Sequence, residues 1–233
     1  MNPIEQPRTP IGPAIEIEFK MLTSPEVLSA IADGTLLREY TIAAQEPREL
    51  VNCYFDTPCF ALKKAGYTLR VRWDGDCWTQ CLKVRKHAVE GLFRREEWEQ
   101  RVDSGAPDIK AIPAGDAFDA VRTAFDTLHA VFVTRFQRTT YEIGFTQPPS
   151  ISPTVLTMCL DVGSIETAVR SAPLAEVELE LVAGPEAGLF EFARILQANY
   201  RLVPGNQSKA ERGYSLVTTP VESPATPRLN AAC

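Results

Sequence analysis

The segment Ile15-Glu16-Ile17-Glu18-Phe19-Lys20 alternates between apolar and charged side chains. Successive side chains of a β-strand point to opposite faces, so this segment predicts a strand with Glu16, Glu18 and Lys20 on one face. Taken alone, the pattern is typical of an edge strand whose charged face lies in water. The sequence repeats the pattern in several other places, which makes that simple interpretation insufficient.

Charged side chains also share one face in four further segments. These are Leu69-Arg70-Val71-Arg72, Cys81-Leu82-Lys83-Val84-Arg85, the segment in which Arg95, Glu97 and Glu99 lie opposite Glu96 and Trp98, and Glu176-Val177-Glu178-Leu179-Glu180-Leu181. Like charges two residues apart on one face repel each other and gain nothing in water. The rows therefore need a structural reason.

A closed β-barrel supplies that reason, because rows of glutamate and rows of lysine and arginine can converge in its interior. The apolar faces would then point outward, beneath helices or a second subunit. Unpaired buried charges are costly, so such an interior must hold water, ions or a charged ligand. Lysine and arginine select a polyanion, and clustered carboxylates select Mg²⁺ or Mn²⁺. A metal-bound polyphosphate satisfies both requirements.

Alternation at period two predicts strands in at least six segments, around residues 15–20, 67–73, 77–85, 92–102, 155–163 and 175–182. Helices are fewer. One is expected to begin at Ser24-Pro25 and end at Gly34, one to span 116–132, one to span 185–198, and a short one to open at Ser208 with a capping box completed by Glu211. The fold class is α+β with a mainly antiparallel sheet.

The 233 residues suffice for one large domain, which we expect over residues 14–217. Four prolines in residues 1–13 predict a flexible arm. Residues 218–233 have the Pro/Ser/Thr composition of a linker, and form either a true terminus or the start of a connection to another domain.

The net charge of −6 argues against general binding of nucleic acid or anionic membranes, since both need a basic surface. No apolar run is long enough to span a membrane and the N-terminus does not resemble a signal peptide, so we expect a cytoplasmic protein. Six cysteines without a C-x-x-C pair favour buried free thiols over disulfides or zinc. Two histidines, and no G-x-S-x-G or P-loop motif, leave carboxylates, lysines and arginines for any catalysis.

An ordered series of motifs resembles one known family, the CYTH or triphosphate tunnel metalloenzymes, and within it the bacterial inorganic triphosphatases. The segment Glu16-Ile17-Glu18-Phe19-Lys20 matches the E-x-E-x-K signature, and Ser208-Lys209-Ala210-Glu211-Arg212-Gly213-Tyr214 matches S-K-x-x-R-G-Y. Between them lie, in the family's order, Tyr54-Phe55-Asp56-Thr57, Leu69-Arg70-Val71-Arg72, Leu82-Lys83, Arg95 with Glu97, Asp161, and the segment 176–180. The series covers residues 15–216.

The resemblance implies an eight-stranded antiparallel tunnel and metal-dependent triphosphate hydrolysis with two Mg²⁺ or Mn²⁺ ions. The residues that it implies as phosphate ligands are Lys20, Arg70, Arg72, Lys83, Arg95, Lys209 and Arg212. The metal ligands that it implies are Glu16, Glu18, Asp161, Glu176, Glu178 and Glu180. Lys83, Arg95, Glu97 and Lys209 are the expected catalytic residues.

Several residues have two interpretations. Asp56-Thr57 belongs either to the site or to a turn. We expect Trp73, Trp78 and Trp98 to pack the barrel rather than stack on a base. Arg135 and Arg138 would point to opposite faces of a strand, and we expect Arg138 in the lumen as a further phosphate ligand.

The predicted function is hydrolysis of inorganic triphosphate to pyrophosphate and phosphate inside a β-tunnel. The alternatives are hydrolysis of an organic triphosphate such as thiamine triphosphate or a nucleotide, cyclisation of ATP as in class IV adenylate cyclases, and non-catalytic binding of polyphosphate. The expected partner is therefore a polyphosphate substrate, with a homodimer as one means of covering the apolar outer faces.

Overall fold

The structure is a computed structural model that describes residues 14–84, 89–115, 118–146 and 152–219. The strands are β1 (Ala14–Leu22), β2 (Thr41–Ala44), β3 (Arg48–Asp56), β4 (Tyr67–Trp73), β5 (Trp78–Val84), β6 (Leu92–Val102), β7 (His129–Phe145), β8 (Thr154–Glu166), β9 (Ser171–Ala183) and β10 (Val203–Pro204). The helices are α1 (Pro25–Asp33), α2 (Thr35–Tyr40), α3 (Ala61–Lys64), α4 (Asp119–Ala124), α5 (Glu186–Asn199) and α6 (Lys209–Thr218). The expected arm, residues 1–13, lies outside the described residues, as does the expected tail, 218–233, from residue 220 onward.

Eight antiparallel strands close into a barrel, as expected. Their order is β1-β6-β5-β4-β3-β7-β8-β9, and pairing of β1 with β9 closes the ring. β2 and β10 extend the sheet beyond the ring, on β7 and β1 respectively. The closure joins the two most widely separated charged strands of the sequence, since Glu18 lies opposite Glu180 and Lys20 opposite Glu178.

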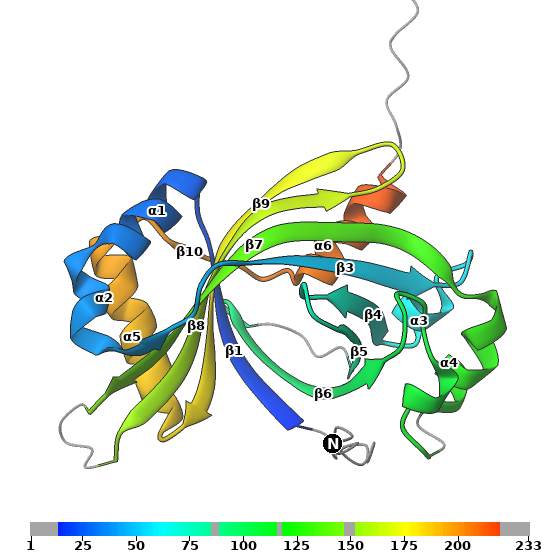
Figure 1. The fold of residues 1–233 in the computed structure, drawn as a ribbon, viewed down its shortest axis with the longest axis horizontal. Coiled ribbons are helices and arrows are strands. Elements are labelled where there is room, and N and C mark those ends of the chain that lie inside the picture. Colours follow the sequence, from blue (N-terminus) through cyan, green and yellow to red (C-terminus); the bar gives the residue numbers. More distant parts are fainter. Residues whose placement is uncertain (1–13, 85–88, 116–117, 147–151, 220–233) are drawn as a thin grey trace, which may run out of the picture.

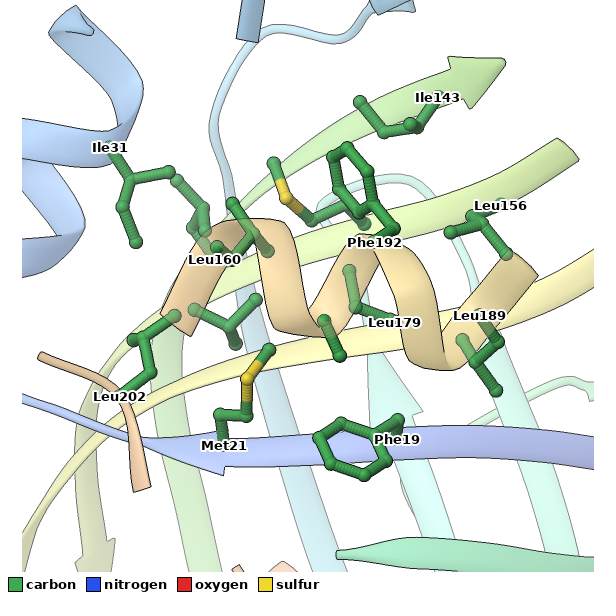
Figure 2. Close-up of a cluster of buried hydrophobic side chains, with 14 of the residues drawn as sticks. Phe19, Met21, Ile31, Ile143, Leu156, Leu160, Leu179, Leu189, Phe192 and Leu202 are labelled. Carbon is green, nitrogen blue, oxygen red and sulfur yellow. The ribbon is translucent and has the colours of Figure 1, made fainter. Parts of the chain in front are cut away.

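One group of helices, α1, α2 and α5, covers the outer faces of β1, β7, β8 and β9 at one end of the molecule (Figure 1). The apolar stripe of α5 packs onto these strands through Leu189, Phe192 and Leu196, all fully buried. Figure 2 shows Phe192 of α5 in one cluster with the strand residues Leu156 and Leu179. The outward side chains Phe19, Val177 and Leu179 of β1 and β9 are therefore covered by helices of the same chain, whereas Ile15 at the start of β1 is exposed.

A second group, α3 and α4, covers β3, β4 and β5 at the opposite end (Figure 1). Val71 and Leu82 are fully or almost fully buried against Val121 and Phe118. The tryptophans pack as expected. Trp73 contacts Trp78 with ring centroids 4.9 Å apart, and Trp98 lies edge-on to Phe118 at the same distance.

Helix α6 differs from the others because it packs against the lumenal face of the barrel. Tyr214 and Ala210 contact Tyr54, Phe132 and Phe136, side chains that share the inward parity of the charged rows. Gly213 permits the close approach, since a Cβ atom there would overlap the ring of Phe132. The predicted capping box is present: Ser208 accepts from the Glu211 amide, and the Glu211 carboxylate accepts from the Ser208 amide.

Two expectations were wrong in part. The segment 116–132 does not form one helix: α4 ends at Ala124, a 3₁₀ turn follows at Phe125–Thr127, and β7 begins at His129. The run Ala130-Val131-Phe132-Val133 is apolar throughout, so it fits the period of a helix as well as that of a strand. Burial of Phe132 on the inner face of the barrel favours the strand. The five described cysteines are free thiols, but Cys81 and Cys159 alone among them are buried and Cys59 is exposed.

The described helices include none that is both long and apolar enough to cross a membrane.

Candidate active site

The inward-facing charged rows line one cavity of about 380 Å³. Ten residues that strand parity assigns to the lumen all belong to its wall. They are Glu16, Glu18, Lys20, Arg70, Arg72, Lys83, Arg95, Glu97, Glu178 and Glu180. Arg138, Lys209, Glu99 and Lys63 also line it.

The cavity wall is nearly balanced in charge. Eight lysine and arginine side chains and seven glutamates line it. The basic rows therefore do not simply repel one another, as an interior of unpaired cations would, because the carboxylate rows neutralise them. A polyanion that enters this cavity must displace carboxylates from their basic partners or bring its own cations.

The wall formed by β1, β5 and β6 is a chain of ion pairs. The Lys83 ammonium lies 3.1 Å from Glu16 and 2.7 Å from Glu97. Arg95 binds Glu16 through Nε and Glu18 through Nη2, the latter at 2.7 Å. Burial alone would raise the pKa of Glu16, but the charges of Lys83 and Arg95 outweigh burial and lower that pKa.

A second cluster lies where β1 and β9 meet the first turn of α6. Glu176 and Glu178 each contribute one carboxylate oxygen, and both oxygens accept from Lys20 and from Lys209 at 2.9 Å or less. Asp161 accepts both Nε and Nη2 of Arg138, at 2.7 and 2.6 Å. Burial opposes the charge on each carboxylate, yet the surrounding cations outweigh it and hold the pKa of Asp161 low and that of Glu178 very low.

A third group, Glu18 and Glu180, keeps carboxylate oxygens that no donor occupies, although the other oxygen of Glu18 accepts from Arg95. Glu18 and Glu180 are cross-strand neighbours, and the Oε1 atom of Glu18 is buried without a hydrogen bond, 3.6 Å from the Lys20 ammonium. Glu180 makes no hydrogen bond or ion pair with any described residue. Burial and the Glu178 charge raise the pKa of Glu18 to about 7, and burial and Glu16 raise that of Glu180. Two neighbouring carboxylates with raised pKa values favour a bound cation.

Arg70 and Arg72 keep donors available to a ligand. Arg72 donates from Nε to Asn52 at 3.0 Å, and the Asn52 amide is held in turn by Thr134. Arg70 lies 3.4 Å from Glu99 and 3.6 Å from Glu97, and its Nε atom is buried without a partner. A buried guanidinium nitrogen without an acceptor is suited to an incoming anion.

The structure brings most, but not all, of the expected site residues to the cavity. Asp161 and Glu176 are fully buried behind Lys20 and Lys209 and are not part of the cavity wall. Arg212 also lies outside the wall, where it contacts Glu176 at 3.4 Å and the Pro173 carbonyl at 2.7 Å.

Arg138 points into the lumen, whereas Arg135 lies outside and forms an exposed pair with Glu49 at 3.2 Å. Both arginines are therefore placed as strand parity predicted. Arg85, expected on the same face as Lys83, lies outside the described residues.

Asp56 has a structural role and is not part of the cavity wall. Its buried carboxylate accepts from the amides of Thr57, Leu62 and Lys63, and from the Tyr214 hydroxyl at 2.8 Å. It therefore fixes the start of α3 and ties α6 to the end of β3.

Sequence analysis missed two further residues of the site, Asn52 and Lys63. Parity with Tyr54 would have placed Asn52 in the lumen, had residues 48–56 been recognised as a strand. Lys63 sits in a four-residue helix and follows no strand parity.

Comparison with known proteins agrees with this geometry. The CYTH domain model matches residues 14–214. An inorganic triphosphatase from Haemophilus influenzae is 29% identical over 202 residues, which cover 86% of this chain and 54% of that protein. The chain thus spans about half the length of this curated relative.

Two solved structures share the fold. A putative adenylyl cyclase from Hippeastrum, described as having a dominant triphosphatase activity, superposes with a TM-score of 0.59 at 21% identity, covering 89% of this chain and 99% of that one. A putative adenylate cyclase from Bacillus halodurans gives 0.50 at 22% identity, with coverage of 88% and 100%. The match of the family model, together with the closed tunnel and its charged lumen, shows that the chain belongs to the CYTH domain family.

Proposed function

We propose that this chain hydrolyses inorganic triphosphate to pyrophosphate and phosphate with the aid of Mg²⁺ or Mn²⁺. The observation that carries the proposal is the coexistence, in one cavity, of carboxylate oxygens without donors and guanidinium donors without acceptors. The former belong to Glu18 and Glu180, and the latter to Arg70 and Arg72. A metal-bound polyphosphate supplies a cation to the first group and oxygens to the second.

The donor set fits a hard divalent cation. Glu18 and Glu180 would hold it, because these carboxylates lie on the lumenal face, keep oxygens without donors, and oxygen ligands suit Mg²⁺ and Mn²⁺. Glu16 lies on the same face, but both its oxygens already accept from Lys83 or Arg95. Bound there, the ion would supply an activated water and charge neutralisation. Among the described residues, two other groups bring ligand atoms within 4.8 Å of one another: Cys81, Glu97 and Glu99, and Asp161, Glu176 and Glu178. The Asp161 group fits less well, because the ammonium groups of Lys20 and Lys209 already occupy its oxygens. The Cys81 group fits less well because Glu97 already binds Lys83 and Glu99 lies 3.4 Å from Arg70.

The residues of the chain bind and neutralise the substrate. Arg70 and Arg72 approach the phosphoryl oxygens with their unused N–H groups, while Arg138 keeps its guanidinium aligned through Asp161. Lys83 and Arg95 are held beside the Glu18–Glu180 pair by Glu16. Fixed cations in this position stabilise charge that develops on the transferred phosphoryl group and on the leaving oxygen, without reorganisation during the reaction.

The relationship with the Haemophilus influenzae protein supports inorganic triphosphate as the substrate. The cavity wall supports it as well, because fifteen of its side chains are charged and four are aromatic: Tyr54, Tyr67, Phe93 and Tyr214. A nucleobase or thiazole ring would need a larger apolar surface to offset the loss of its hydration.

The experiment is phosphate release from tripolyphosphate, ATP, thiamine triphosphate and pyrophosphate, each with Mg²⁺, with Mn²⁺ and with EDTA. We expect metal-dependent release that is fastest with tripolyphosphate. Faster release from ATP or thiamine triphosphate would contradict the proposed substrate and indicate an organic triphosphate instead. Binding of tripolyphosphate without release under any condition would instead support a polyphosphate-binding module.

A further inference from the structure

We propose that Lys63 binds an end phosphoryl group of the polyphosphate at the rim of the tunnel, so that α3 contributes a substrate contact from outside the eight strands. The inference rests on the proposed function, since it names a further residue of the same site.

The position of Lys63 is the first reason. Helix α3 connects the end of β3 to the start of β4, and the Lys63 side chain lines the cavity at that end, next to Tyr214. The strand residues Arg70 and Arg72 line the wall farther along β4. Lys63 therefore lies at the rim and not in the middle of the tunnel.

The pairing of Lys63 is the second reason. The cavity cations Lys20, Lys83, Arg95, Arg138 and Lys209 each form an ion pair with a carboxylate at 3.2 Å or less. The Lys63 ammonium instead lies over the Tyr214 ring, 5.0 Å from its centroid, and within the described residues it has no carboxylate within ion-pair distance. A substrate phosphoryl oxygen can reach it without displacing an internal carboxylate.

The backbone beneath Lys63 is unusually well fixed, which is the third reason. Asp56 accepts from the amides of Thr57, Leu62 and Lys63 and from the Tyr214 hydroxyl. Phe60, just before α3, adopts a left-handed conformation with φ of 57° and packs edge-on to Tyr214. A cation on so short a helix gains a defined position only through such anchoring, and a defined position lowers the entropic cost of binding.

The chain offers a matched control in Lys64. It is the next residue of the same helix, it is exposed, and it does not line the cavity. The test compares Lys63→Met, which keeps the aliphatic stem over Tyr214 but removes the charge, with Lys63→Arg and Lys64→Met. Binding of tripolyphosphate and of pyrophosphate is measured by calorimetry, with Ca²⁺ and with EDTA, and the melting temperature without ligand is recorded.

Lys63→Met is expected to weaken tripolyphosphate binding about tenfold, the loss of roughly one charge-assisted hydrogen bond, and to change pyrophosphate binding less than twofold. Lys63→Arg should keep most of the affinity, and Lys64→Met all of it, with unchanged melting temperatures. The proposal is overturned if Lys63→Met binds tripolyphosphate like the wild type, or if both anions are weakened equally, which would indicate only a general effect of charge.

These outcomes separate the inference from the proposed function. If the wild type binds tripolyphosphate but releases no phosphate, the proposed function fails, while a selective loss in Lys63→Met still supports the contact. A wild-type chain that binds tripolyphosphate under neither condition overturns both.

Discussion

Two groups of carboxylates face the inside of this barrel, and they differ in whether hydrogen-bond donors occupy their oxygens. Asp161 and Glu176 are fully buried, and Lys20, Arg138, Lys209 and Arg212 supply donors to their oxygens. The Glu18–Glu180 pair joins β1 to β9, the strand that also carries Glu176, and keeps oxygens without donors. The difference teaches that a carboxylate row in a tunnel is not uniform in role. We call Asp161 and Glu176 the saturated group, because donors occupy their oxygens, and Glu18 and Glu180 the unsaturated group. We infer that the saturated group positions the basic side chains and that the unsaturated group binds metal.

The largest expected effect comes from removing charge in the unsaturated group. Glu18→Gln and Glu180→Gln should each lower metal-dependent phosphate release roughly 100-fold or more, because a bound metal supplies several kcal/mol of transition-state stabilisation. Binding of tripolyphosphate without metal should be equal or stronger, since a repelling carboxylate is gone. The measurements are turnover with Mg²⁺ and titration calorimetry in EDTA.

Glu142→Gln, on an exposed position of β7, is the control and should retain wild-type turnover. Full activity in Glu18→Gln and Glu180→Gln would assign these carboxylates to structure and remove the basis of the comparison.

The saturated group predicts a stability effect instead. Glu176→Gln leaves the buried ammonium groups of Lys20 and Lys209 and the guanidinium of Arg212 with less compensation. Removing one partner of a buried ion pair costs about 3 kcal/mol of unfolding free energy. Urea unfolding measures this loss, and Mg²⁺ titration should show unchanged affinity. A variant as stable as the wild type that binds Mg²⁺ poorly would place Glu176 among the metal ligands.

Arg72 is expected to show an intermediate effect. Asn52 is its hydrogen-bond partner, so its remaining donors are available to phosphate. Arg72→Ala should raise KM for tripolyphosphate about tenfold, the loss of a charged hydrogen bond, and should lower kcat where that contact tightens in the transition state. Arg135→Ala, on the outer face, should change neither constant. Lys83→Ala should act like Arg72→Ala but also loosen Glu16 and Glu97.

The smallest effect concerns pH. Burial and the Glu178 charge raise the pKa of Glu18 to about 7, so Mg²⁺ must displace a proton from part of the protein near neutrality. The Mg²⁺ affinity should fall about threefold between pH 7.5 and pH 6.5, as expected for one group titrating near 7. Calorimetry in buffers of different ionisation enthalpy measures both the affinity and the released proton. An affinity independent of pH over this range would contradict the assignment.

The same shift has a consequence for stability with a definite sign. The folded protein holds the Glu18 proton more tightly than the unfolded chain, whose glutamate titrates near 4.5. The contribution of Glu18 to stability is therefore fully present below about pH 4.5 and declines as the pH rises through about 7. Without metal, the free energy of unfolding of Glu18→Gln should fall less than that of the wild type as the pH rises from about 4.5 through about 7.

Strand parity predicted the lumen well, because the period of two fixes the face of each side chain once a strand is assigned. It placed ten charged residues in the cavity and separated Arg138 from Arg135. It could not predict which carboxylates have all their oxygens occupied, because the cation that Asp161 and Glu176 share, Lys209, lies on a helix whose position depends on tertiary packing. The prediction of one helix over 116–132 was wrong for a related reason. Its apolar residues fit the period of a helix and of a strand, and only the tertiary burial of Phe132 on the inner face of the barrel favours the strand.

The pairing of β1 with β9 has a consequence for the time course of synthesis. Lys20 and Glu176 are 156 residues apart, so at about 5–20 residues per second the ribosome makes β1 roughly 8–30 s before the strand that closes the ring. During that interval one edge of β1 has no native neighbour and is open to pairing with other nascent chains. Charges at alternate positions are a known protection of exposed strand edges. Glu16, Glu18 and Lys20 would thus reduce aggregation of the incompletely synthesised barrel, a role separate from ligand binding.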